Sequence, residues 1–149
     1  MSHRSIIVYV DRSVRPSYPE WVKEPLYPEH ECSGPENFDP GTLNQYLFGK
    51  QLSGGYETGH AIHEHLLSDG LLASCVNLQD LVAIKSLGIK LFRKHFKGKA
   101  LFAWKSVVSD HDGGLRVPCL VGYARYAMLG CYLLETGWNE YRPALRLAD

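Results

Sequence analysis

The hydrophobic pattern of the first forty residues predicts one strand followed by a long loop. Residues 5–10 are rich in β-branched side chains and are followed by polar residues, which is typical of a buried strand. Residues 11–40 follow neither the helical nor the strand period and contain six prolines. Because aromatic side chains are spaced through this stretch, we expect an ordered, Pro-rich loop and not a disordered linker.

Two short helices are predicted in the middle of the chain. Asp39 is a good N-cap and Pro40 suits the first helical position, so we expect a helix that ends at about Phe48. Thr58 can cap a second helix over residues 59–68, which a glycine then terminates.

A third helix, the longest, is predicted over residues 77–97. Asn77 can cap it, and Asp80 lies in the first turn, where the helix dipole favours an anion. Apolar residues recur at helical spacing along the segment until Gly98. This helix is therefore expected to pack one face in the core.

From residue 100 the pattern changes to the period of strands. Three strands are predicted, at residues 100–109, 115–124 and 127–135, with a Gly-rich turn after the first. Pro118 has no N–H to donate, so the middle strand should lie at an edge or be bulged.

The order of these elements favours an α+β fold. We expect an antiparallel sheet of three to four strands, the N-terminal strand being the fourth, packed on two to three helices. The expected organisation is a single domain over residues 1–149, with the Pro-rich loop at 11–40, a mainly helical part at 40–97 and the strands at 100–135.

Composition narrows the class of protein further. Hydrophobic residues make up 45% of the chain and charged residues 21%, as in ordinary globular proteins. No apolar run approaches a membrane span, and the apolar run near the start is too short for a signal peptide. The four cysteines are widely scattered, so we expect reduced thiols. Without a membrane span or a signal peptide, we expect a cytoplasmic location and no membrane partner.

The charges are segregated along the chain although the formal net charge is zero. Residues 16–58 hold seven acids against two bases, Lys23 and Lys50, whereas residues 81–109 hold seven bases and no acid. Such asymmetry predicts two surfaces of opposite charge.

The basic run is the first candidate binding surface. Lys90, Lys94 and Lys97 are spaced by four and then three residues, which places them on one helix face. Cations near a helix C-terminus are also favoured for structural reasons, which is the alternative interpretation. The candidate binding residues on this surface are Lys85, Lys90, Arg93, Lys94, Lys97 and Lys99.

The acidic, aromatic loop over residues 18–38 is the second candidate surface. Tyr18, Trp21 and Tyr27 belong to the residue types that anchor protein interfaces. The alternative is that these aromatic side chains pin the loop onto its own sheet.

The densest group of potential ligands or catalytic groups is in the predicted second helix. His60, His63 and Glu64 are three and four residues apart and share a helix face, as a metal site or a general base would require. Their order nevertheless differs from the zinc-protease motifs, and common nucleophile and phosphate-loop motifs are absent. We therefore favour ordinary histidines and expect no metal or cofactor.

Five blocks of sequence resemble a group of small proteins carried by bacteriophages and prophages. The blocks are residues 11–21 (DRSVRPSYPEW), 74–81 (SCVNLQDL), 92–99 (FRKHFKGK), 103–108 (AWKSVV) and 143–148 (PALRLA). The pattern has an aromatic residue at position 63. The resemblance implies a small accessory protein that binds, redirects or inhibits a host machine, including host defences.

The leading hypothesis is thus a non-catalytic protein that binds a host protein or complex in the bacterial cytoplasm. A small metal- or His-dependent hydrolase and a nucleic-acid-binding protein that uses the basic helix face are the alternatives. Self-association through the two charged surfaces is a further possibility.

Overall fold

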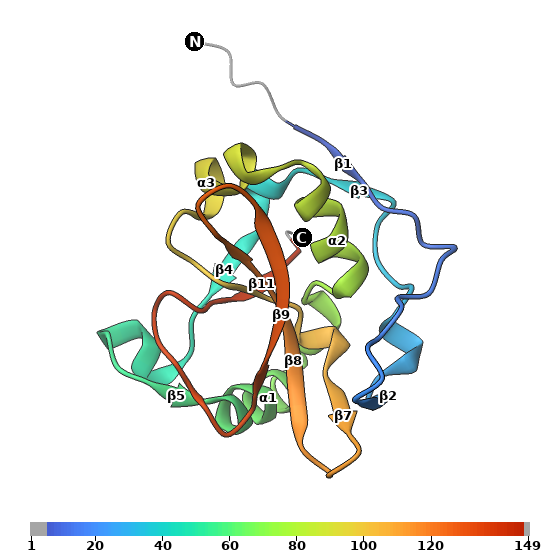
Figure 1. Ribbon diagram of the computed structural model, residues 1–149. Helices are drawn as coiled ribbons and strands as arrows, with labels where there is room; N and C mark the ends of the chain where they lie inside the picture. The colour runs from blue at the N-terminus through green and yellow to red at the C-terminus, as the bar shows by residue number, and fades with distance from the viewer. Residues whose placement is uncertain (1–5, 148–149) are drawn as a thin grey trace.

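The computed structural model describes residues 6–147 and shows a mixed α/β protein. Within these residues the chain forms three α-helices and a mostly antiparallel sheet of seven strands (Figure 1). The helices are α1 (Gly59–Ser68), α2 (Leu78–Ser86) and α3 (Ile89–Phe96). None of them has the length and apolar character that a membrane crossing requires.

The seven-stranded sheet is built around one long strand, β8 (Leu115–Gly122). Along one side β8 pairs with β9 (Ala127–Leu133), and along the other it pairs first with β7 and then with β6. The remaining strands extend the sheet outward: β2 beyond β7, and β11 and then β4 beyond β6. The bounds are β2 Val22–Pro25, β4 Asn44–Tyr46, β6 Leu101–Phe102, β7 Val108–Asp110 and β11 Ala144–Arg146.

Two short antiparallel pairs lie apart from this sheet. The first joins β1 (Val8–Tyr9) to β3 (Asn37–Phe38), and the second joins β5 (Glu57–Thr58) to β10 (Gly137–Trp138). We expected the N-terminal strand to join the main sheet as its fourth strand, but β1 pairs with β3 instead. Residue 5 of the expected strand lies outside the described residues.

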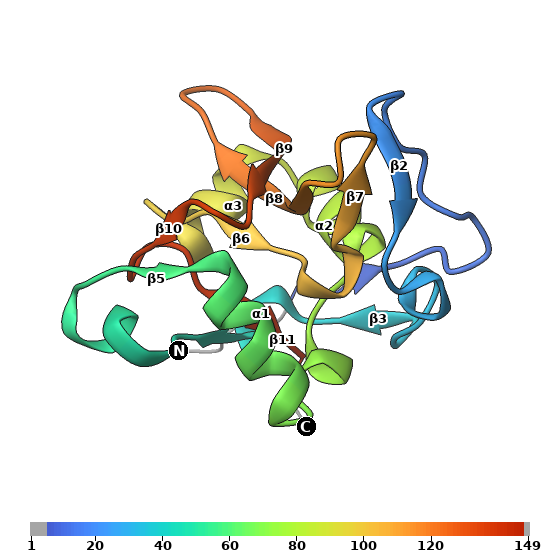
Figure 2. The same ribbon diagram turned by 90° about the horizontal axis from the view of Figure 1, so that it is seen from below.

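Two hydrophobic clusters fill the interior. The helices α2 and α3 pack on the first, which includes Leu81, Phe96 and Leu120. The helix α1 packs on the second, around Trp104 and Trp138. Figure 1 shows α1 at the bottom of the molecule with α2 and α3 above it, and in Figure 2, seen from below, α1 lies in the foreground.

The N-caps of α1 and α2 are those that the sequence predicts. The Thr58 hydroxyl accepts the N–H of Ala61 at 3.2 Å. Asn77 accepts the N–H of Asp80 at 3.0 Å, and Asp80 in return accepts the N–H of Asn77 at 2.9 Å. Reciprocal bonds of this kind satisfy N–H groups that a helix start leaves without partners.

The predicted long helix over residues 77–97 is two helices. The break falls at Gly88, whose φ of 91° lies in the left-handed region that other residues rarely adopt. The chain turns there, and α3 begins at the next residue.

The predicted helix from Pro40 to Phe48 is wrong. Asp39 does act as a cap, by accepting the N–H of Gly41, but only one 3₁₀ turn follows, at Pro40–Thr42. The next residues form β4, which pairs with β11. A contact with a distant strand thus overrides a correct local start signal.

The predicted strand over residues 100–109 is interrupted. A 3₁₀ turn at Trp104–Ser106 separates β6 from β7. Pro118 lies opposite this turn, in a central strand and not at an edge, and its carbonyl accepts the N–H of Ala103 at 3.0 Å. In an antiparallel strand the N–H and C=O of one residue point to the same neighbouring strand. The position at which Pro118 lacks an N–H therefore faces the 3₁₀ turn between β6 and β7.

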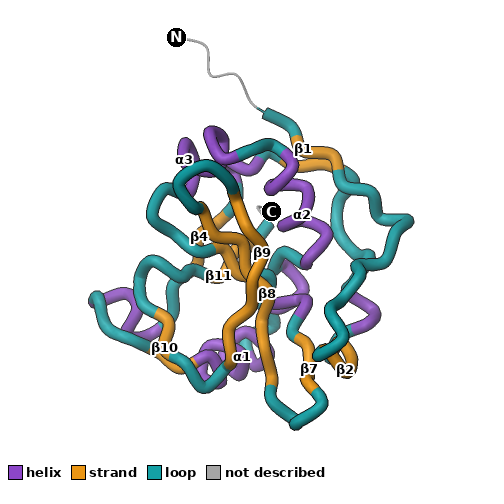
Figure 3. The backbone as a smooth tube through the Cα atoms, viewed as in Figure 1, coloured by secondary structure: helices purple, strands orange, loops and turns teal. Residues whose placement is uncertain are grey.

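The segment over residues 11–40 runs along the outside of the molecule, mostly as loop (teal in Figure 3). It is not devoid of regular structure, because it contains β2, β3 and a 3₁₀ turn at Pro28–His30. The strand β2 forms one edge of the main sheet.

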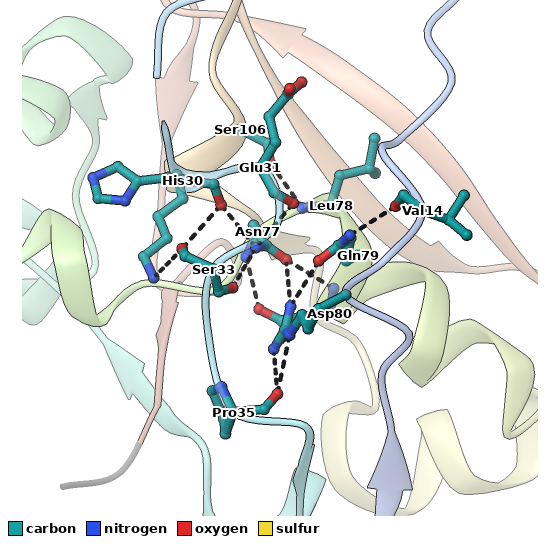
Figure 4. Close-up of polar contacts among 12 residues, drawn as sticks. Val14, His30, Glu31, Ser33, Pro35, Asn77, Leu78, Gln79, Asp80 and Ser106 are labelled. Atoms are coloured by element: carbon teal, nitrogen blue, oxygen red, sulfur yellow. Dashed lines mark hydrogen bonds and ion pairs between the residues drawn. The ribbon is translucent and has the colours of Figure 1, made fainter. Parts of the chain in front are cut away.

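A buried polar cluster at the N-terminus of α2 fastens this segment (Figure 4). The guanidinium of Arg12 lies 2.7 Å from the Asp80 carboxylate and donates to the carbonyl of Pro35 at 2.7 Å. The side-chain amide of Asn77 donates to the carbonyls of His30 and Ser33. These bonds explain how a Pro-rich segment with little secondary structure is held in place.

Candidate binding surface

The helix α3 presents a basic outer face and an apolar inner face. Phe92 and Phe96, four residues apart, are buried in the first hydrophobic cluster. Lys90, Arg93 and Lys94 point outward and are exposed. The predicted shared face therefore applies to Lys90 and Lys94 of this amphipathic helix, whereas Lys97 follows the helix as its C-cap, with an extended ψ of 129°.

The turn between β8 and β9 lies beside α3. Arg93 donates from its guanidinium to the carbonyl oxygens of Tyr123, at 3.3 Å, and of Ala124. The turn carries Arg125 between two tyrosines, and the exposed fractions of Tyr123 and Tyr126 are 52% and 58%. Two exposed aromatic rings thus accompany the cations of α3.

A pocket of about 470 Å³ lies on one side of the α3 N-terminus. Lys85 of α2, Ile89 of α3 and the pair Arg125 and Tyr126 line it. The basic side chains of α2 and of the β8–β9 turn therefore face a common hollow.

A second pocket, of about 430 Å³, lies beside the C-terminal half of α3. Arg93, Lys97 and Lys99 line it from the helix and the residues after it. Tyr132 and Arg142 line it from β9 and from the segment before β11. Arg142 is held by a 2.6 Å bond to the carbonyl of Gly137, and its guanidinium lies 4.5 Å from the centre of the Tyr132 ring.

We call this region the basic surface. All of its cations except Arg142 lie between residues 81 and 134, where the only acids are Asp110 and Asp112. Asp110 ends β7 and Asp112 lies in the turn after it, at the far end of β8 from the β8–β9 turn. The basic surface consists of Lys85, Lys90, Arg93, Lys94, Lys97, Lys99, Arg125 and Arg142.

One cation of the basic run does not belong to the basic surface. Lys105 is buried, and its ammonium lies 3.3 Å from the Ser33 hydroxyl. Burial lowers the pKa of Lys105, while the nearby carboxylate of Asp80 acts in the opposite direction.

The aromatic residues of the acidic loop mostly face inward. Tyr18 is half-buried against the first hydrophobic cluster, and burial, followed by the nearby Glu31 carboxylate, raises its pKa. The hydroxyl of Tyr27 lies 2.6 Å from Nε2 of His63. Trp21 is 39% exposed, with the Arg116 guanidinium 5.2 Å from its ring centre. Pinning of the loop therefore accounts for Tyr18 and Tyr27, and Trp21 alone of the three remains at the surface.

The structure does not bring His60, His63 and Glu64 together as a reactive group. His63 is 8% exposed and stacks on Trp104, whereas His60 and Glu64 are exposed. Between residues 6 and 147, no group of three His, Cys, Asp or Glu side chains is arranged to hold a metal ion. All four cysteines of this part of the chain carry free thiols.

Sequence reasoning missed part of the basic surface. The absence of acids continues from residue 113 to residue 134, and extending the charge count would have found Arg125 with its flanking tyrosines. No local signal connects Arg142 to α3, because the fold alone brings these residues to one pocket.

Comparison of the chain with protein-family models, curated proteins and solved structures finds no match.

Proposed function

We propose that the chain is a non-catalytic accessory protein of the phage type that binds an acidic surface of a host protein through the basic surface. The observation that carries this proposal is the concentration of seven cations of this surface between residues 81 and 134, where the only acids are Asp110 and Asp112, together with Arg142, which the fold brings to the same pocket as Arg93 and Lys97. The phage setting rests on the resemblance in sequence alone.

The basic surface has the physical properties of a recognition site. Uniform positive charge speeds encounter with an acidic partner and disfavours basic ones. Exposed Tyr123 and Tyr126 add large, rigid apolar surfaces of the kind that anchor interfaces. The cations would orient the acidic partner, and the rings of Tyr123 and Tyr126 would supply apolar surface that becomes buried on binding.

The arrangement of the histidines favours binding over catalysis. A general base must reach the proton that it removes, but the imidazole of His63 is bonded to Tyr27 and packed on Trp104. The nearest acid partner of His60 is the exposed Glu135, with 3.9 Å between Nε2 and Oε1. These contacts favour a structural role for His60 and His63 over a catalytic one.

The test is affinity capture from a nuclease-treated bacterial lysate with a triple variant, Lys90→Glu, Lys94→Glu and Lys97→Glu. Arg93 is left unchanged because it fastens the β8–β9 turn. We expect a stoichiometric host protein whose binding the triple variant weakens by at least about tenfold.

The matched control is the pair Lys23→Glu and Lys50→Glu, two exposed lysines of the acidic segment. It should retain the partner. Equal retention by the triple variant, with an unchanged circular dichroism spectrum, would remove the basic surface from the proposed function.

A second candidate function is binding of nucleic acid, which the exposed tyrosines beside Arg125 favour. Single-stranded nucleic acid is held by cations along its backbone and by aromatic rings that stack on its bases. In that case the captured material disappears on nuclease treatment, and the affinity falls steeply as salt rises.

A further inference from the structure

We infer that the pocket between α3 and the segment before β11 binds a nucleoside phosphate. The inference goes beyond the proposed function, because it concerns a small ligand and requires no macromolecular partner. It rests on a pocket of about 430 Å³ that combines cations, tyrosine rings and a side-chain amide without an acidic lining residue.

The cations suit a phosphate group. Arg93, Lys97 and Lys99 reach the pocket from one side, and Arg142 reaches it from the other. In the part of the chain that the structure describes, Lys97 makes no hydrogen bond or ion pair, so its ammonium is available to a ligand. Arginine and lysine donors around one anion give charge-assisted bonds, which are stronger than neutral ones.

The aromatic residues suit a planar base. Tyr141 is 54% exposed at the pocket, so one face of its ring can stack on a base. Tyr132 already carries the guanidinium of Arg142 over its ring, which places a cation next to an aromatic platform. Any base can stack on a tyrosine ring. The ring therefore selects ligands that contain a planar base and does not distinguish one base from another.

Asn139 adds a polar group that can contact a base edge or a ribose. Its side-chain oxygen accepts the N–H of Tyr141 at 2.9 Å. This bond orients the amide and leaves its two N–H donors for a ligand. The same bond fixes the backbone of Tyr141 relative to Asn139, so the two groups are presented together.

The size of the pocket agrees with this class of ligand. Small-molecule sites occupy roughly 300 to 1,000 Å³, and a mononucleotide falls at the lower end of that range. The same chemistry is presented by a free nucleotide and by one unit of a single-stranded nucleic acid, and the two sources are separable by experiment.

The experiment is isothermal titration of the full chain with adenosine 5′-monophosphate and, separately, with a short single-stranded oligonucleotide. We expect saturable binding at one site. Binding of the mononucleotide identifies a free nucleotide as ligand, whereas binding of the oligonucleotide alone identifies a unit of nucleic acid. No saturable binding of either probe overturns the inference.

The variants Lys97→Gln and Tyr141→Ala test the two halves of the site. Each should weaken binding by about tenfold, the first through the phosphate contact and the second through stacking. Lys94→Gln is the matched control, since it removes the same charge three residues earlier, within α3 and outside the pocket lining. An equal loss in the control, or equal affinity for inorganic phosphate, would show general anion binding and overturn the assignment.

These outcomes are distinguishable from a failure of the proposed function. Lys97 belongs to both sites, but Tyr141 lines the pocket and is absent from the charge reversals used in the capture experiment. Tyr141→Ala should therefore weaken nucleotide binding and still capture the host protein. A chain that binds nucleotide but captures no protein would refute the proposed function and leave the pocket assigned.

Discussion

His63 shows how a residue that attracts a catalytic interpretation is used in the core. Its ring lies between Trp104, at 5.9 Å between ring centres, and the hydroxyl of Tyr27. Burial, and then the charge of His60, lower the pKa of His63. The folded protein therefore keeps this imidazole neutral at pH values where an exposed histidine is charged.

The stability of the fold should consequently fall in mild acid. Below about pH 6.5 the unfolded chain protonates His63, while the folded chain, with its lowered pKa, does not. The unfolded state then binds more protons, so the free energy of unfolding decreases as the pH falls through this window. Urea unfolding between pH 8 and pH 5 measures the slope.

The variant His63→Phe should show a smaller slope, because it removes the titrating group and keeps an aromatic ring. His111→Gln is the control, since His111 is exposed in the β7–β8 turn. A slope in His63→Phe equal to that of the unchanged protein would place the pH dependence elsewhere.

At the scale of elements, local signals predicted where helices begin but not how far they extend. Thr58 and Asn77 are correct caps because a cap depends only on N–H groups two or three residues away. Asp39 is an equally good cap, yet its helix stops after one turn because β4 pairs with β11. A strand partner from the other end of the chain leaves no trace in the local pattern.

The same distinction applies to the basic surface. Lys90 and Lys94 lie within one helix, so their shared face could be inferred from sequence, whereas Lys97 follows the helix as its C-cap. Tyr132 and Arg142 reach the pocket through the sheet topology. The sequence therefore predicts the charged helix face, and the pocket beside it emerges only from the tertiary arrangement.

The start of α1 offers a test of how tightly the elements fit. A methyl group at Gly59 would lie 2.6 Å from Cζ3 of Trp138 and 2.8 Å from the backbone of Leu134. Although alanine favours helix, the overlap should make Gly59→Ala less stable by about 1–3 kcal/mol. Chemical denaturation followed by tryptophan fluorescence measures the change.

Gly130 of β9 provides the comparison, because a methyl group there would lie 3.7 Å from the Cys119 sulfur, an ordinary contact. Gly130→Ala should change stability by no more than about 0.5 kcal/mol. Similar values for the two variants would show that the close approach at Gly59 is not a constraint on packing.

At the scale of the whole molecule, β11 connects two parts of the sheet. It pairs in parallel with β6 on one side and antiparallel with β4 on the other. Leu145, in the middle of β11, is completely buried in the first hydrophobic cluster. The strand that joins the outer part of the sheet to its centre thus also fills the core.

Leu145→Ala should therefore lower the free energy of unfolding by about 2–5 kcal/mol. Amide hydrogen exchange should also become faster in β4, because β11 is its only neighbour in the described sheet. The exposed Leu52→Ala is the control and should leave both measurements nearly unchanged. Fast exchange in β4 without global destabilisation would indicate that β4 opens independently.

The position of β11 also has a consequence for synthesis on the ribosome. Among the described strands it is translated after all the others, yet its place lies between β4 and β6, so the nascent chain must expose both unpaired edges until residues 144–146 emerge. Joining β4 to β11 then closes a loop of roughly a hundred residues, a slow step in folding. The described sheet can thus be completed only after β11 has been translated, and the unpaired edges of β4 and β6 expose the nascent chain to aggregation or to chaperones until then.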